Sequence, residues 1–221
     1  MRGGALAGAP PRGSMEALRS IAASVGVTPG EMLEYLAFAF GVVNVALIVR
    51  RSIWNYAFGI ASVSAAFFVL VTARLFAEAG LQIFFVAVNL YGWVKWNEAR
   101  KEAGTIVVLL LPAAQRMAWA VGIVVTGVAL GWAMDRFTAA ASPYPDALIA
   151  TASIAAQILL ALRRLENWVL WILVDLVAVP LYLSRGIEPL AWLYAIFLAL
   201  SVAGLVTWWR VLNEATEARQ P

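Results

Sequence analysis

The sequence predicts an all-α membrane protein with seven membrane-spanning helices in a 3+1+3 arrangement, in which a linker helix joins two parallel three-helix repeats. Three observations lead to this prediction: the composition, the spacing of the apolar stretches and an internal repeat. Of the 221 residues, 63% are hydrophobic and 13% are charged. A soluble domain has about 25% charged residues, so this chain could not cover a globular surface and has to lie in lipid. The composition excludes a disordered protein, a free cytosolic enzyme and a nucleic-acid-binding module.

Several residue types that support chemistry are missing. The chain contains no cysteine and no histidine, so disulfides, thiolate nucleophiles, imidazole bases and ordinary zinc sites are not expected. A GxxxxGK[ST] loop is also absent, which argues against ATP-driven transport by this chain alone. We therefore expect no metal, no cofactor and no catalytic residue.

Seven apolar stretches approach the length of about 20 residues that a membrane span needs. The first three form a predicted repeat over 31–97, the fourth is the predicted linker helix at 117–134, and the last three form a second repeat over 145–209. Residues 1–30 are rich in Gly, Ala and Pro and are interpreted as a flexible tail, not a cleaved signal. Residues 210–221 are the predicted cytoplasmic tail. In order, the predicted spans are 32–49, 54–71, 80–96, 117–134, 147–162, 168–183 and 189–209.

The distribution of basic residues predicts the orientation. With seven spans the two termini lie on opposite sides, and short loops rich in Lys and Arg face the cytoplasm. This rule places the N-terminus outside and the C-terminus in the cytoplasm. The loops of the other side contain fewer basic residues, namely Arg74, Arg136 and Arg185, besides three in the N-terminal tail. On the C-terminal side lie Arg50, Arg51, Arg100, Lys101, Arg116, Arg163, Arg164, Arg210 and Arg219.

An internal repeat is visible when the second half is placed over the first at an offset of 113. In this register Arg50-Arg51 falls on Arg163-Arg164, Asn44 on Gln157, and Trp96 on Trp209. Four spans separate each helix from its counterpart, and an even number preserves direction, so the repeats would be parallel about an axis along the membrane normal. Coincidental similarity between apolar helices is the alternative.

The sixth predicted span contains an acid at bilayer depth. Trp168, Trp171 and Asp175 are spaced i, i+3 and i+7, and Tyr182 follows at i+14, so all four lie on one helical face. A carboxylate in this place costs about 3 kcal/mol on insertion scales and needs a cavity or a partner. Aromatic rings next to a carboxylate suit a flat, positively charged ring. The alternatives are a structural acid bonded to a neighbouring helix and, for Trp168, an interfacial anchor.

Four amides form a second group of candidates. Such side chains can bond sugar hydroxyls or a carboxamide, or they can hold helices together at about 0.6 kcal/mol per contact. Because two of them are related by the predicted repeat, we favour a shared polar cavity. The four amides are Asn44, Gln82, Asn89 and Gln157.

The YGWVKW element at 91–96 closes the third predicted span. Trp93 and Trp96 are candidates for a gate, although tryptophans often mark the membrane interface. Pro180 removes a backbone hydrogen bond from the sixth span and is a candidate hinge.

Together with ENWVLW at 166–171 and Asp175, the YGWVKW element resembles the PnuC-type nicotinamide riboside transporters, bacterial inner-membrane proteins with a SWEET-like fold. The resemblance covers about residues 34–209. It implies the 3+1+3 arrangement, a homotrimer, and facilitated diffusion of nicotinamide riboside. A cytoplasmic kinase would then trap the substrate inside the cell, without any need to contact the transporter directly. The ligand contacts that it implies are Gln82, Asn89, Gln157, Asn167, Trp168, Trp171, Asp175 and Tyr194, to which depth in the membrane adds Asn44.

Substrate identity stays open at this stage. Many members of the resembled family have asparagine where this chain has Asp175, and related branches carry thiamine or riboflavin. A membrane-embedded enzyme or assembly factor is a further alternative. It is disfavoured because such a protein needs clustered acids, histidines or cysteines.

Overall fold

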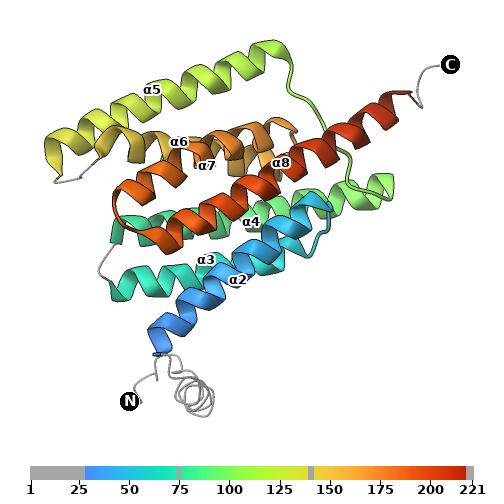
Figure 1. Cartoon of the computed structure of the whole chain (residues 1–221). Coiled ribbons are helices and arrows are strands. Elements are labelled where there is room, and N and C mark those ends of the chain that lie inside the picture. Colours follow the sequence, from blue (N-terminus) through green and yellow to red (C-terminus); the bar gives the residue numbers. More distant parts are fainter. Residues whose placement is uncertain (1–27, 74–75, 139–141, 218–221) are drawn as a thin grey trace, which may run out of the picture.

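The structure, a computed structural model, describes residues 28–73, 76–138 and 142–217. The predicted tail at 1–27 and residues 218–221 lie outside this part. Within it the regular elements are helices that lie side by side and alternate in direction, so α2 begins at one end of the bundle and α8 ends at the other (Figure 1). Their bounds are α2 Pro29–Val49, α3 Asn55–Thr72, α4 Phe76–Ala103, α5 Ala113–Phe137, α6 Pro143–Ala161, α7 Glu166–Ser184 and α8 Glu188–Glu217.

Six of the described helices are long and apolar enough to cross a membrane, which confirms a multi-pass, all-α membrane protein. The exception is α4, which carries Gln82, Asn89 and Lys95 along the predicted third span. Helices α4 and α8 have 28 and 30 residues and extend beyond the apolar stretches that predict them. The predicted cytoplasmic tail therefore begins inside α8.

The first helix begins at a capping box. Thr28 Oγ1 accepts a hydrogen bond from Glu31 N at 3.3 Å, and Glu31 Oε2 accepts one from Thr28 N at 2.7 Å. Pro29 occupies the first turn, where its missing N–H costs nothing. These local signals start the helix three residues before the predicted span at 32–49.

Six helices form a closed ring. Helix α2 packs against α3 and α8, α4 packs against α3 and α6, and α7 packs against α6 and α8. The backbones of the helices on opposite sides of the ring, α2 and α6, α3 and α7, and α4 and α8, do not come close to each other in the described part. Helix α5 packs on α6 from outside the ring (Figure 1). Side chains on the inner face of the ring can therefore meet around a common axis.

A cluster of buried side chains closes one end of the ring. The ring centroids of Trp96 and Trp208 lie 5.9 Å apart, and edge-to-face contacts join Tyr56 to Trp96 and Trp168 to Trp208 at 5.3 and 5.5 Å. Each ring helix contributes one large residue to this cluster. These residues, called the plug below, are Ile48 of α2, Tyr56 of α3, Trp96 of α4, Leu160 of α6, Trp168 of α7 and Trp208 of α8.

Two hydrogen bonds cross the plug. Trp96 Nε1 donates to the carbonyl of Leu160, and Trp208 Nε1 donates to the carbonyl of Ile48, both at 3.2 Å. Each bond ties the indole of one helix to the C-terminal turn of another, α4 to α6 and α8 to α2. The two bonds are related by a shift of 112 residues.

The predicted repeat register of 113 is therefore wrong by one residue. The left-handed backbone position is Arg51 in the first turn (φ 54°) but Arg163 in the second (φ 59°). Arg51, the second arginine of the first pair, thus corresponds to Arg163, the first arginine of the second pair. Aligning both arginines of each pair therefore gives a register that is one residue too long. Trp96 corresponds to Trp208 and not Trp209. Asn44 corresponds to Ala156, whereas the sequence predicted Gln157.

The segment at 104–112, between α4 and α5, crosses the plug end. Arg51 Nη1 donates to the carbonyl of Ile106 at 2.9 Å, and Arg164 Nη1 donates to the carbonyl of Leu110 at 2.8 Å. Backbone hydrogen bonds also join the segment to the α6–α7 turn. The segment is thus bonded to both turns of the ring, and we call it the strap.

We expect Gly204→Ala to destabilise the protein. A Cβ at Gly204 would lie 2.5 Å from the Trp168 ring, and overpacking of this kind costs about 1–3 kcal/mol. That cost exceeds the gain of about 1 kcal/mol from helix propensity. The melting temperature of the purified protein in detergent measures the effect. Gly122→Ala is the matched control, because a Cβ at Gly122 has no neighbour within 4 Å. Equal or higher melting of Gly204→Ala would contradict this packing.

Candidate functional site

Buried and partly buried polar side chains gather one to two helical turns from the plug, on five of the six ring helices. Each lies three to seven residues from the plug residue of its own helix, about 4–11 Å along the axis. Polar groups at this depth need partners or a wet cavity. These residues, called the polar layer below, are the buried Asn89 of α4, Gln157 of α6, Asp175 of α7 and Ser201 of α8, with the partly buried Asn44 of α2.

Asp175 is almost completely buried, with 1% of its surface exposed. Ser201 Oγ donates to Asp175 Oδ2 at 3.2 Å, which joins α7 to α8. The ion pairs of the described part involve other acids, and no lysine or arginine there pairs with Asp175. A buried carboxylate with one neutral partner is suited to a cationic ligand.

The amides of the layer have spare hydrogen-bonding groups. Asn89 Nδ2 donates to the carbonyl of Phe85 on its own helix at 2.8 Å. Asn44 Oδ1 is buried without a donor. The Gln157 amide makes no hydrogen bond within residues 28–73, 76–138 and 142–217. These groups remain available to a ligand.

Trp171 lies between the plug and Asp175 on α7. It is partly buried and packs against the cluster that contains the plug. One helical turn separates it from Trp168 on one side and from Asp175 on the other, as the i, i+3, i+7 spacing predicts. An indole and a carboxylate thus lie on one face of α7.

Other predicted site residues lie in or near the plug. Trp96 and Trp168 are plug residues, and Asn167 donates through Nδ2 to the carbonyl of Arg164 in the α6–α7 turn. Trp93 lies elsewhere, with 37% of its surface exposed on α4. The predicted YGWVKW element therefore has one tryptophan in the plug and one on the surface.

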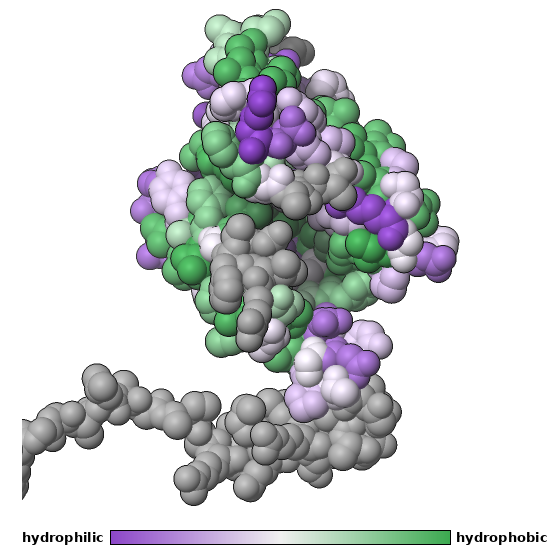
Figure 2. All heavy atoms as spheres, turned by 90° about the vertical axis from the view of Figure 1, so that its left-hand side faces the viewer, coloured by the Kyte–Doolittle hydropathy of each residue, from purple (hydrophilic) through white to green (hydrophobic). Residues whose placement is uncertain are grey.

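The last predicted residues lie towards the opposite end of the ring. Tyr194 stacks on Tyr182 at 5.2 Å, and Gln82 is partly buried on α4. Beyond them, Arg185 Nη2 contacts Asp146 Oδ2 at 2.8 Å, and this hydrogen bond raises the pKa of Arg185. Figure 2 shows this end of the bundle, where apolar side chains surround a hollow near the centre.

Ser201 is the member of the polar layer that sequence reasoning missed. It is a lone hydroxyl in an apolar helix, and a single serine gives no signal of depth or partner. At the observed shift of 112 it corresponds to Asn89. The correct register would have pointed to it.

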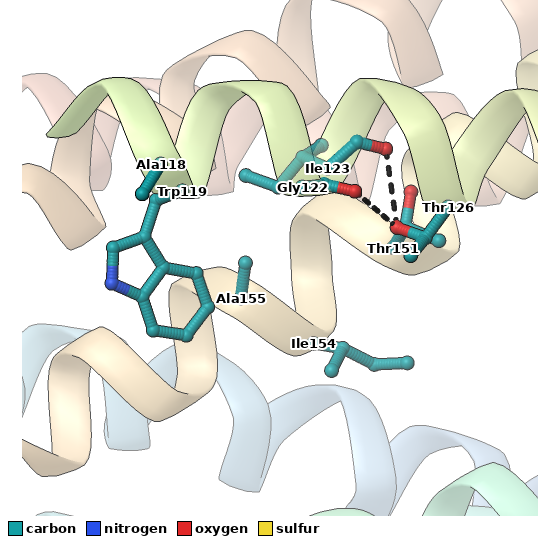
Figure 3. Close-up of a pocket in the computed structure, with 8 residues that line it drawn as sticks. All are labelled: Ala118, Trp119, Gly122, Ile123, Thr126, Thr151, Ile154 and Ala155. Atoms are coloured by element: carbon teal, nitrogen blue, oxygen red, sulfur yellow. Dashed lines mark hydrogen bonds between the residues drawn. The ribbon is translucent and has the colours of Figure 1, made fainter. Parts of the chain in front are cut away.

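A groove between α5 and α6 differs in chemistry from the polar layer of the ring. It has a volume of about 510 Å³, lies outside the ring and shares no residue with the polar layer (Figure 3). Its two hydroxyls, Thr126 and Thr151, bond carbonyls of their own helices. This groove offers apolar surface with satisfied polar groups, so we place the candidate site in the ring.

A ring of helices around a polar layer in a membrane protein is typical of a membrane transporter. The chain matches the model of the family described as nicotinamide mononucleotide transporter over residues 31–210, and it belongs to this family. The resemblance to PnuC-type proteins is confirmed, and the chain is a transporter, not an enzyme.

Named relatives cover most of the chain. The riboflavin/roseoflavin transporter RibM of Streptomyces davaonensis is 33% identical over 76% of this chain and 80% of its own. The nicotinamide riboside transporter PnuC of Escherichia coli is 26% identical over 84% of this chain and 87% of its own. A solved structure, the crystal structure of the vitamin B3 transporter PnuC, matches with a TM-score of 0.70 and 27% identity over 90% of both chains.

We expect Asp175→Asn to leave the melting temperature unchanged or to raise it. Asparagine keeps an oxygen that can accept from Ser201, and it removes a buried charge that has no counter-ion. Thermal unfolding in detergent measures this, with Asp135→Asn on the exposed surface of α5 as the control. A lower melting temperature for Asp175→Asn alone would make the carboxylate a structural group.

Proposed function

We propose that this chain carries nicotinamide riboside across the bacterial inner membrane by facilitated diffusion, and that a cytoplasmic kinase traps it inside without required contact. The observation that carries the proposal is the buried, unpaired carboxylate of Asp175 beside Trp171. Nicotinamide riboside joins a flat pyridinium cation to a carboxamide and a sugar, which match a carboxylate, an indole and amides. The PnuC names of the relatives from Escherichia coli and Neisseria mucosa support the same substrate.

The proposed ligand contacts fall into groups according to their position along the axis of the ring. We assign direct contact with the ligand to the polar layer and Trp171, and entry contacts to Gln82 and Tyr194. Trp168 and Asn167 support the site from the plug side, and Trp96 acts as the gate. Trp93 is the weaker gate candidate because it is exposed.

The 3+1+3 arrangement is part of this proposal. Helices α2–α4 and α6–α8 would be parallel, SWEET-like repeats, and α5 the linker. The matching indole–carbonyl bonds at a shift of 112 support it, as do the helix directions in Figure 1. The plug end, with its arginine-rich turns, would face the cytoplasm. A homotrimer is proposed from the family resemblance.

Riboflavin is the second candidate, because RibM is 33% identical to this chain. Riboflavin has a flat but uncharged ring system, so it would use Trp171 and the amides but not the charge of Asp175. Thiamine, which is cationic, is a third candidate from the sequence. The charge of Asp175 therefore separates the cationic vitamins from riboflavin.

We expect proteoliposomes containing the purified chain to take up labelled nicotinamide riboside in preference to thiamine and riboflavin. Uptake should need neither ATP nor a sodium gradient and should proceed in both directions, because the chain has no nucleotide-binding loop. Protein-free liposomes are the control. Preferred uptake of riboflavin would show that riboflavin, and not nicotinamide riboside, is the substrate. Accumulation far above the outside concentration without a trapping enzyme would contradict facilitated diffusion.

We expect Asp175→Asn to weaken binding of nicotinamide riboside about tenfold, since a charge in a partly desolvated site contributes roughly 1–2 kcal/mol. Trp171→Ala should weaken binding by a similar or greater factor through lost stacking, and Trp171→Phe should restore part of it. Calorimetry on monodisperse protein measures each affinity, with Asp135→Asn as the matched control. Unchanged affinity in both Asp175→Asn and Trp171→Ala would move the site towards Asn44 and Asn89.

A further inference from the structure

Two amide oxygens point at the same place on α3. A Cβ at Gly59 would lie 3.0 Å from Asn89 Oδ1 and 3.1 Å from Asn44 Oδ1. The two oxygens come from different helices, α4 and α2, on either side of α3. The missing side chain of Gly59 leaves the space in which they converge. We call these three residues the cradle.

Neither oxygen has a donor. Asn89 is 4% exposed, and because its Nδ2 donates to the carbonyl of Phe85, its Oδ1 is turned towards Gly59. In the described part of the chain no N–H or O–H group donates to Asn89 Oδ1 or to Asn44 Oδ1. A buried acceptor without a donor is costly, typically by about 1–3 kcal/mol. Asn44 Oδ1 is a buried acceptor of this kind, and Asn89 Oδ1 lies near it, also without a donor from the described residues, so the pair can accept from a donor outside the chain.

The opposite side of the ring has the reverse arrangement. At the shift of 112, Gly59 on α3 corresponds to Trp171 on α7, Asn89 to Ser201, and Asn44 to Ala156. On the α3 side two large amides surround a glycine, and on the α7 side small residues accompany an indole. The two sides therefore offer different chemistry: two hydrogen-bond acceptors on the α3 side, and an aromatic ring and the carboxylate of Asp175 on the α7 side.

We propose that Gly59 determines specificity, because it lets the Asn44 and Asn89 oxygens bind an uncharged N–H or O–H donor of the transported molecule. The inference rests on the proposed function for the identity of that molecule. Nicotinamide riboside has two groups of this chemistry, the primary carboxamide and the ribose hydroxyls. An anionic group in the cradle would face two partial negative charges.

The first test compares two glycine variants. Gly59→Ala places a methyl group in the cradle, where both amides must shift by a few tenths of an ångström. We expect it to raise the KM for uptake of nicotinamide riboside at least tenfold in proteoliposomes, with an unchanged or higher melting temperature. Gly122→Ala makes the same chemical change in α5 with no neighbour within 4 Å, and it should transport like the parent chain.

The second test identifies the donor with two analogues as competitors. Nicotinic acid riboside replaces the carboxamide by a carboxylate, and the 2′-deoxy analogue of nicotinamide riboside removes one hydroxyl. The parent chain should bind at least one of them tenfold more weakly than nicotinamide riboside, and that one identifies the group in the cradle. In Gly59→Ala this difference should shrink to about threefold or less.

Two results would overturn the inference. One is Gly59→Ala with the KM of the parent chain, and the other is equal binding of both analogues and nicotinamide riboside by the parent chain. The proposed function is judged separately, by whether the parent chain transports nicotinamide riboside at all. If it transports riboflavin instead, the two glycine variants are compared with riboflavin, and equal KM values would again overturn the role of Gly59.

Discussion

The arrangement of this protein depends on the two indole–carbonyl hydrogen bonds that cross the plug. Trp96 bonds the end of α6, and Trp208 bonds the end of α2. Both bonds join helices that are neighbours in the ring but far apart in the chain, so they hold the ring closed at this end. The glycines Gly92 and Gly204 let the Tyr56 and Trp168 rings approach α4 and α8 closely. Without this closed end, the polar layer would not be closed off on the plug side.

The plug and the polar layer oppose each other energetically. The plug packs large aromatic and aliphatic side chains closely together, and such packing stabilises the association of helices in a membrane. The polar layer, one to two turns away, buries an acid and amides whose hydrogen bonds are incomplete within the described part. A stable apolar end thus supports a layer that would be unfavourable by itself, and this is the usual division between scaffold and site.

Much of the fold could be predicted from the sequence because apolar length and loop arginines are strong signals in membrane proteins. Asp175 and the amides were identifiable because polar groups are rare at this depth. The repeat register was not, because identity of both arginines in each pair favours 113, whereas the backbone conformation of Arg51 and Arg163 and the two indole–carbonyl bonds give 112. The role of Gly59 was also invisible, since it arises where three helices meet and a glycine has no chemistry of its own.

The strap has a consequence for any change of shape at the plug end. It accepts a hydrogen bond from Arg51 at the α2–α3 turn and another from Arg164 at the α6–α7 turn. If these two turns move apart, the strap can follow only one of them unless a bond to the other breaks. One half of the ring would then move together with the strap and, through it, with α5, while the other half moves alone. Any opening at this end would therefore be asymmetric, because only one half of the ring would carry the additional mass of the strap and α5.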